Sequence, residues 1–132
     1  MYSWGGGGPA YNKGQLGLGH LKDVLKPELI NELSDKFIVS FACGGFHTLA
    51  LTSDNKLFAW GSSELGECGT GEKNCYSKPK QIFFHNLKNQ KNSKNESIEE
   101  LTNNYQEDDK NNEDIQIKQI AAGGHHSIVL TG

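Results

Sequence analysis

Two histidines in matching surroundings are the residues of this chain whose type and spacing are best suited to chemistry. His47 lies two residues after Gly44-Gly45, and His126 lies two residues after Gly123-Gly124. A histidine near neutral pH can act as a base or bind a metal. Because the residue recurs together with its neighbours, we interpret both as structural, with a ring nitrogen bonded to nearby backbone. We expect replacement of either by alanine to cost about 1–3 kcal/mol of stability.

The other reactive residue types form no constellation that indicates catalysis. Ser127 follows His126 directly, so the two side chains of a strand would point to opposite faces. Neither Gly-Gly pair continues into the lysine and serine or threonine of a phosphate-binding loop. Asp54 belongs to a predicted turn, where aspartate is common. His20 and His85 have no partner at helical or strand spacing, and we expect His125 to be exposed. No catalytic, cofactor-binding or metal-binding residue is therefore assigned.

Three cysteines, Cys43, Cys68 and Cys75, give an odd number without a close pair. A disulfide framework needs an even set in a secreted context. A zinc site needs four ligands, commonly with short cysteine spacings that Cys68 and Cys75 do not have. We interpret all three as reduced thiols that fill small gaps in a core.

The charge pattern argues against nucleic acid and membranes as direct partners. All 13 basic residues are lysine, and the formal net charge is −3. Residues 86–114 hold 4 lysines and 8 acids, so the negative balance lies in that segment. No basic face and no guanidinium group is available to read phosphate or guanine. No apolar run is longer than the four residues 57–60, which predicts no transmembrane helix. We expect a soluble intracellular protein, cytoplasmic or nuclear.

An internal repeat organises the rest of the chain. The Trp4-Gly5 pair recurs 56 residues later, and the glycine-rich segment 14–19 recurs 52 residues later. Residues 42–52 recur as residues 121–131, a separation of 79. These separations differ because the first glycine segment carries four extra residues and the second repeat carries 27. Self-similarity at such a period is typical of solenoids and propellers.

Residues 86–114 are the larger insertion, with 8 asparagines and 12 charged residues. Such a composition cannot bury enough apolar area to offset the entropy of ordering. We predict a low-complexity, disordered loop that should be cut first in limited proteolysis. Its interpretation stays open between a tolerated surface expansion and an acidic docking segment.

Short apolar runs bounded by turn residues predict strands between the insertions. Residues 48–52 and 57–60 flank a Ser/Asp/Asn cluster, which is typical of a hairpin. Further strands are expected at residues 81–84 and 115–120, and residues 28–33 favour a strand over a helical turn. Strands of four to six residues repeating every ~50 residues indicate small antiparallel sheets. The predicted fold class is therefore all-β, a partial β-propeller of about two to two and a half blades over residues 1–132.

The repeat resembles the regulator of chromosome condensation repeat. Residues 60–71 (WGSSELGECGTG) fit the family pattern without a gap, with Ser63, Glu67 and Cys68 replacing the usual asparagine, glutamine and leucine. Residues 14–19 keep GQLGLG intact, and both motif histidines fall on the family histidine. Kelch repeats share a Gly-Gly pair and a tryptophan but lack this histidine and this segment. In this pattern we interpret Trp4 and Trp60 as packing residues between blades.

The resemblance implies a protein partner rather than an active site. Some family members are guanine nucleotide exchange factors for the small GTPase Ran, and many more are interaction modules, including parts of ubiquitin ligases. The residues of exchange activity lie outside the repeat consensus and cannot be placed on this chain. We therefore favour a protein–protein interaction module that is not an enzyme and needs no cofactor. Ran-type exchange, which would require a complete propeller, is the alternative.

The repeat count adds an expectation about completeness. A closed propeller needs at least about four blades, more than the roughly two and a half found here. The chain is then either a fragment whose other blades follow in cis, or a unit whose copies assemble in trans. We favour the fragment, because assembly of partial rings demands a well-matched interface.

Overall fold

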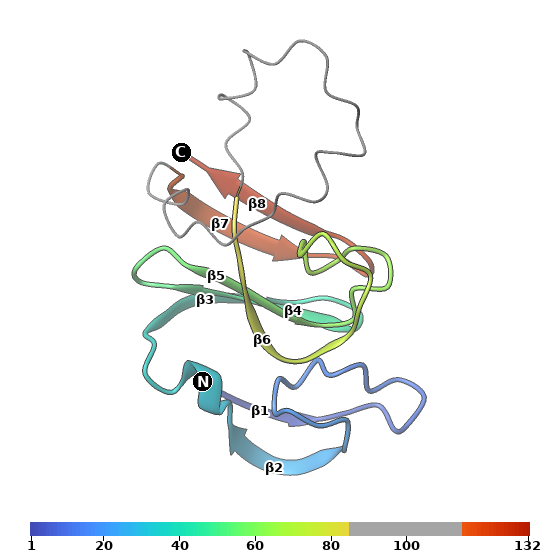
Figure 1. The fold of residues 1–132 in the computed structure, drawn as a ribbon. Coiled ribbons are helices and arrows are strands. Elements are labelled where there is room, and N and C mark those ends of the chain that lie inside the picture. The colour runs from blue at the N-terminus through green and yellow to red at the C-terminus, as the bar shows by residue number, and fades with distance from the viewer. Residues whose placement is uncertain (85–114) are drawn as a thin grey trace.

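The computed structural model describes residues 1–84 and 115–132, which form three antiparallel sheets and one short 3-10 helix (Figure 1). The elements are β1 (Tyr2–Gly5), β2 (Val24–Leu29), η1 (Asn31–Leu33), β3 (Ile38–Cys43), β4 (His47–Thr52), β5 (Leu57–Gly61), β6 (Tyr76–Ile82), β7 (Ile117–Ala122) and β8 (Ser127–Thr131). The predicted all-β, partial-propeller fold is confirmed.

The sheets are one complete blade between two half blades. The second blade has the strand order β3-β4-β5-β6, while β1-β2 form the first blade and β7-β8 the third. The sheets lie one above another (Figure 1). Strands β2 and β6 each contain a proline, Pro27 and Pro79, and both lie at a sheet edge, where a missing N–H is tolerated.

The repeats match in register and in their irregularities. Strands β1-β2 pair as β5-β6 do, with a bulge between Ser3 and Gly5 where β5 has one between Ala59 and Gly61. Strands β7-β8 pair as β3-β4 do, again with a bulge at the same place. The first half blade therefore corresponds to β5-β6, and the third to β3-β4.

Alternation along β4 supplies both cores. Leu49 and Leu51 join a cluster that includes Ile120 of the third blade. Ala50, which points to the other face, joins a cluster with Trp60 and with Ile30, which follows β2. All six residues of β4 are buried, because a central strand between two neighbouring blades has no solvent face.

Glycines let consecutive blades approach each other closely. The Gly45 N–H donates to the Gly123 carbonyl oxygen at 3.3 Å. Methyl groups on Gly44 and Gly45 would lie 2.6 and 2.7 Å from the carbonyl oxygens of Gly123 and Gly124. The repeated Gly-Gly pair is therefore a contact between blades, as close backbone approach requires.

The bounds of several strands differ from those predicted from the sequence. Residues 28–33, expected as a strand, divide between the end of β2 and the 3-10 turn η1. Strand β6 ends at Ile82, so only half of the expected strand 81–84 forms, and β7 begins at Ile117 rather than Ile115. Strand β3 was not expected. The predicted disordered insertion, residues 86–114, lies outside the described residues, as does His85.

Candidate functional site at the joint between blades

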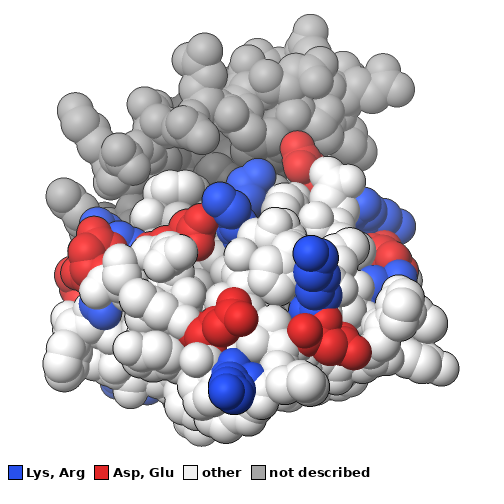
Figure 2. Space-filling view, turned by 90° about the horizontal axis from the view of Figure 1, so that it is seen from below, with Lys and Arg blue, Asp and Glu red and all other residues white. Residues whose placement is uncertain are grey.

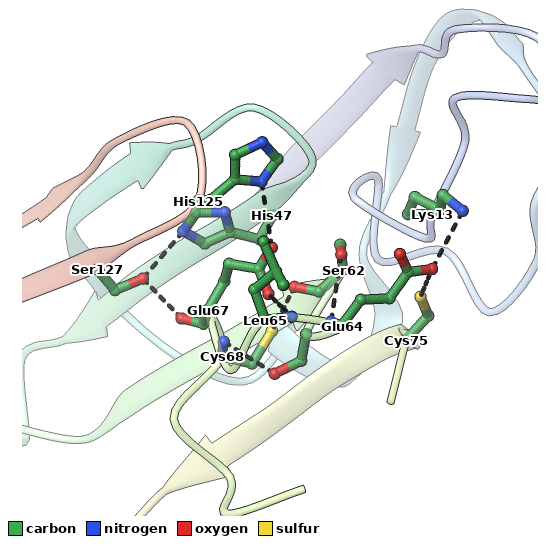
Figure 3. Close-up of polar contacts among 11 residues, drawn as sticks. Lys13, His47, Ser62, Glu64, Leu65, Glu67, Cys68, Cys75, His125 and Ser127 are labelled. Carbon is green, nitrogen blue, oxygen red and sulfur yellow. Dashed lines mark hydrogen bonds and ion pairs between the residues drawn. The ribbon is translucent and has the colours of Figure 1, made fainter. Parts of the chain in front are cut away.

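The motif histidine His47 lies at the joint between the second and third blades (Figure 3). Its Nε2 is 2.9 Å from the Ser127 hydroxyl at the start of β8. That hydroxyl donates to the Glu67 carbonyl oxygen, in the β5–β6 loop, at 2.7 Å. The predicted partner of the ring was backbone, and this is wrong for Nε2, whose partner is a side chain of the next repeat.

The direction of these bonds decides what the joint can do. Ser127 has one hydroxyl proton, and the Glu67 carbonyl takes it, so the oxygen accepts from His47 Nε2–H. A catalytic pair needs the opposite arrangement, in which the histidine accepts the serine proton. His47 is also only 1% exposed. The contact therefore fastens two blades and does not activate a nucleophile.

Burial sets the charge state of the two titratable groups. Desolvation is the main reason that the pKa of His47 lies below its ordinary value, so the ring is held neutral. Burial opposes ionisation of the Glu67 carboxyl, but backbone N–H groups and His125 outweigh it and lower its pKa. One carboxylate oxygen accepts the Leu65 N–H at 2.9 Å, and the other lies 3.5 Å from His125 Nδ1.

The preceding joint is built in the same way. Thr48, the counterpart of Ser127, donates its hydroxyl to the Gln15 carbonyl oxygen at 3.0 Å. Gln15 is the counterpart of Glu67, and its carbonyl also accepts the Trp60 indole N–H at 2.8 Å. Each repeat thus offers one carbonyl that the next repeat binds. Trp60 is 1% exposed, which confirms its predicted role between blades.

The outer copies of the same residues are not buried. Trp4 is 59% exposed, so its predicted packing between blades is wrong within the described residues. His126 is exposed although its ring lies over Gly123 just as the His47 ring lies over Gly44. Both lie where no further described blade covers them, which is the physical reason for the difference.

The cysteines divide by position. Cys68 is 2% exposed, and burial raises the pKa of its thiol to about 11. Cys43 and Cys75 are free but exposed, so the prediction that all three fill a core holds only for Cys68.

Three residues with ring side chains belong to the β1–β2, β3–β4 and β7–β8 connections. These connections lie at the same end of the three blades (Figure 1). Tyr11 stacks on Phe46 with ring centroids 6.1 Å apart, and Phe46 lies 6.4 Å from His125. Tyr11 is 59% exposed, and the His125 side chain is 60% exposed, as expected. We call Tyr11, Phe46 and His125 the aromatic row. A Lys13–Glu64 ion pair of 3.2 Å joins the first two blades.

Other kinds of site find little support in the part of the chain that the structure describes. No group of three or more histidine, cysteine or acidic residues there could hold a metal. No helix in residues 1–84 or 115–132 is long and apolar enough to cross a membrane. On the face of the β1–β2 sheet, lysines and acids are interspersed among uncharged residues (Figure 2).

The sequence did not indicate that Ser127 bonds both to His47 and to the Glu67 carbonyl oxygen. In the sequence Ser127 stands next to His126, and Glu67 stands where the repeat usually has glutamine. The available signal was the separation of 79 between Thr48 and Ser127, because a hydroxyl kept after each motif histidine implies a shared partner.

Comparison with known proteins identifies the family of the repeat. A family model described as the regulator of chromosome condensation (RCC1) repeat matches residues 1–51 and 54–94. A second model of the same description matches residues 38–67.

Two human relatives match the chain over different lengths. Protein RCC2 is 43% identical over 86 residues, which cover 64% of this chain and 16% of RCC2. Probable E3 ubiquitin-protein ligase HERC6 is 30% identical over 132 residues, which cover 99% of this chain and 10% of the ligase. The chain therefore spans a small part of the length of these relatives.

A solved structure matches almost the whole chain. Prp20p from Saccharomyces cerevisiae, described together with its binding properties to Gsp1p and histones, superposes with a TM-score of 0.64 at 30% identity. The match covers 98% of this chain and 26% of Prp20p.

Proposed function

Because the chain belongs to the regulator of chromosome condensation (RCC1) repeat family, we propose that it works as a protein–protein interaction module. The blades form the scaffold, and the loops at one end carry the binding surface. His47, Trp60 and the hydroxyls of Thr48 and Ser127 make bonds between blades. We therefore assign binding to side chains that vary between repeats.

The aromatic row is the observation that carries this proposal. Phe46 and His125 occupy the same place in consecutive repeats, between the Gly-Gly pair and the histidine, yet differ in type. Together with Tyr11 they form a continuous line of rings over three blades. Tyr11 and His125 are exposed, and Phe46 between them is half-buried. Aromatic side chains held by a rigid scaffold supply much of the energy in protein interfaces. The joints between blades fix the spacing of the rings.

The experiment measures binding of the 132-residue chain to purified Gsp1p and to purified histones, the partners named for Prp20p, by surface plasmon resonance. We expect Tyr11→Ser or Phe46→Ser to weaken the binding by about tenfold or more. Phe37→Ser is the control for Tyr11→Ser, because Phe37 is 74% exposed, Tyr11 is 59% exposed, and Phe37 lies at the opposite end of β3 from the aromatic row. Equal losses in Phe37→Ser and Tyr11→Ser would contradict the assignment of this surface.

Guanine nucleotide exchange on a Ran-type GTPase is the second candidate, favoured by the likeness to Prp20p, which binds Gsp1p. It is tested by release of a fluorescent guanine nucleotide from the purified GTPase. Because exchange would require a complete propeller, the assay uses a complete propeller that contains this chain, and acceleration of release supports exchange. Binding without acceleration in that protein supports the interaction module alone.

The likeness to HERC6 suggests a ubiquitin-pathway protein as another class of partner. We also propose an intracellular location, cytoplasmic or nuclear. Its support is that Cys43, Cys68 and Cys75 are all free, as is usual for thiols in a reducing compartment.

A further inference from the structure

The two joints between blades have the same architecture but differ in one pair of side chains. Gln15 in the first repeat has Glu67 as its counterpart in the second, and Phe46 has His125 as its counterpart in the third blade. Phe46 stacks on Tyr11 of the first blade, whereas His125 meets Glu67 of the second. The second joint therefore brings together two titratable side chains where the first has an amide and a phenyl ring.

Gln15 shows what the position of Glu67 does for the fold. Its Oε1 accepts the Lys13 N–H at 2.6 Å, and Glu67 Oε2 accepts the Leu65 N–H at 2.9 Å in the same way. A neutral amide therefore closes this turn as a carboxylate does. The Glu67 side chain is 2% exposed, and burying a charge costs free energy that burying an amide does not. The fold alone does not require the charge of Glu67.

That charge acts on His125. Burial opposes ionisation of Glu67, but hydrogen bonds from backbone N–H groups and His125 lower its pKa, so the side chain is a carboxylate at neutral pH. Its Oε1 lies 3.5 Å from His125 Nδ1, and the other ring nitrogen points away from Glu67 (Figure 3). A carboxylate only accepts hydrogen bonds, so Nδ1 carries the proton. The neutral ring then presents Nε2 as a hydrogen-bond acceptor.

The two acidic side chains of this loop are compensated differently. The Glu64 carboxylate has a lysine partner, Lys13, at 3.2 Å. Among residues 1–84 and 115–132, the ion pair of Glu67 is with a histidine, which is charged only when it is protonated. The pair of Glu67 and a neutral His125 therefore carries one negative charge next to the aromatic row.

The other titratable groups around this pair do not neutralise it. His47 on β4 is held neutral because burial lowers its pKa. Burial also raises the pKa of the Cys68 thiol to about 11, so it stays protonated. His126, the neighbour of His125 in the β7–β8 connection, has its ring over Gly123. The compensating charge must come from a proton on His125 or from a bound cation.

The aromatic row sets the spacing of the side chains that it can bind. Its ring centroids lie 6.1 and 6.4 Å apart. Alternate side chains of an extended strand lie about 6.4–6.8 Å apart on one face, since each residue advances by about 3.2–3.4 Å. A polyproline helix repeats only about every 9 Å, so it does not match the row. The row therefore fits an extended segment that contacts each ring with every second side chain.

Resting on the proposed function, we propose that the aromatic row binds an extended segment of a basic protein, with two alternate apolar side chains followed by an arginine or lysine. The apolar side chains contact Tyr11 and Phe46. The cationic group donates a hydrogen bond to His125 Nε2, and the Glu67 carboxylate behind the ring compensates its charge. A proton on His125 supplies the same charge, so the proton and the segment compete for the Glu67–His125 pair.

The test is isothermal titration calorimetry of the 132-residue chain with two synthetic peptides. Both consist of serine with leucine at positions two and four, and they carry either arginine or glutamate at position six. We expect the arginine peptide to bind at least about fivefold more tightly. Its affinity should rise by about threefold or more from pH 6 to pH 8, a range over which histidine side chains lose their proton. Equal affinities for the two peptides, or no detectable binding of the arginine peptide, overturn the proposal.

Two variants of the chain test the pair itself. Glu67→Gln keeps the acceptor for the Leu65 N–H and removes only the charge, and His125→Phe restores the ring of the preceding repeat. We expect each to weaken binding of the arginine peptide at pH 8 by about fivefold or more and to abolish its pH dependence. Glu64→Gln is the matched control, because it makes the same chemical change in the same loop at a carboxylate that already has a lysine partner.

Tyr11→Ser separates this proposal from the proposed function. If Tyr11→Ser weakens binding of the arginine peptide but Glu67→Gln and His125→Phe do not, the row is a binding surface and the assignment of a cationic partner is wrong. If Tyr11→Ser leaves the binding unchanged, the surface itself is wrong. Equal losses in Glu64→Gln and Glu67→Gln also overturn the role given to the Glu67–His125 pair.

Discussion

The second and third repeats carry the same histidine motif but bury it to different degrees. The His47 and His126 rings each lie over the first glycine of their Gly-Gly pair. His47 is 1% exposed because Ser127 and the β5–β6 loop cover it, whereas His126 is exposed. The local motif therefore orients the ring, and the next blade buries it.

The tryptophans make the same comparison toward the N-terminus. Trp60 is buried because the first blade offers it a carbonyl oxygen and a glycine to pack on. Trp4 has the same neighbours in sequence, yet it is exposed where no described blade precedes it. A repeat residue in this fold thus stabilises the protein mainly through contacts at the joint between blades rather than within its own blade. This is expected for repeat architectures.

Trp60→Ala should give the largest effect of any change at the joints. We expect the free energy of unfolding to fall by about 3–5 kcal/mol, because the variant loses a buried indole and leaves a cavity. Trp4→Ala should change it by less than about 0.5 kcal/mol in the single chain. Urea unfolding followed by circular dichroism at low protein concentration measures both. Similar losses of unfolding free energy in the two variants would contradict the claim that burial between blades distinguishes Trp60 from Trp4.

The histidines should differ in the same direction by a smaller amount. His47→Ala is expected to cost about 1–3 kcal/mol through its lost bond to Ser127 and lost packing. His126→Ala should cost less than about 0.5 kcal/mol, because its ring is exposed. This corrects the expectation from sequence that both would cost the same. The melting temperatures of the two variants test this difference. A larger loss for His126→Ala than for His47→Ala would contradict the claim that the next blade gives the histidine its stabilising role.

The lowered pKa of His47 predicts how stability depends on pH. Its pKa in the folded chain lies below the ordinary value of 6.5, so the unfolded chain takes up the proton first as pH falls. Stability from this group is complete above pH ~6.5 and declines below it, with a slope of at most about 1.4 kcal/mol per pH unit. His47→Gln should weaken the pH dependence of the melting temperature between pH 6.5 and about pH 5, above the range in which carboxyl groups titrate. If the melting temperature of His47→Gln fell with pH as steeply as that of the parent chain, His47 would not be the cause of the pH dependence.

The Lys13–Glu64 ion pair should give the smallest effect, although it too crosses a joint. Its side chains are 37% and 58% exposed, so solvent screens their attraction. Glu64→Gln is expected to change the free energy of unfolding by no more than about 0.5 kcal/mol. Denaturant midpoints at low and at high salt measure it. A loss as large as that of His47→Ala would mean that charge, and not burial, holds the first two blades together.

The strands that alternate clearly, and those flanked by turn residues, could be predicted from the sequence. The Ser/Asp/Asn cluster between Thr52 and Leu57 predicted the β4–β5 hairpin, and the alternating residues 115–120 predicted much of β7. Strand β3 was not predicted because the sequence there begins with a continuous apolar run, Phe37-Ile38-Val39. In the structure only alternate residues of the strand are partly buried. Local patterns cannot show which residues a neighbouring blade will cover.

The candidate site was less predictable for the same reason. The motif marked His47 and Trp60 as structural, but not that Ser127, 80 residues away, would bond to His47. The aromatic row depends on how far one blade lies from the next, which no spacing within a single repeat encodes. Contacts between repeats follow from three-dimensional stacking, so they needed the structure.

Hydrogen exchange measured by mass spectrometry tests the central claim most directly, because it reports the stability of each strand separately. The sample is the 132-residue chain at low protein concentration. The account predicts slow exchange in β4 and β5, which have a blade on either side. It predicts markedly faster exchange in β1-β2 and β7-β8, each of which has one neighbouring blade among residues 1–84 and 115–132. Equal protection of all three sheets would contradict the claim that stability resides in the joints between blades.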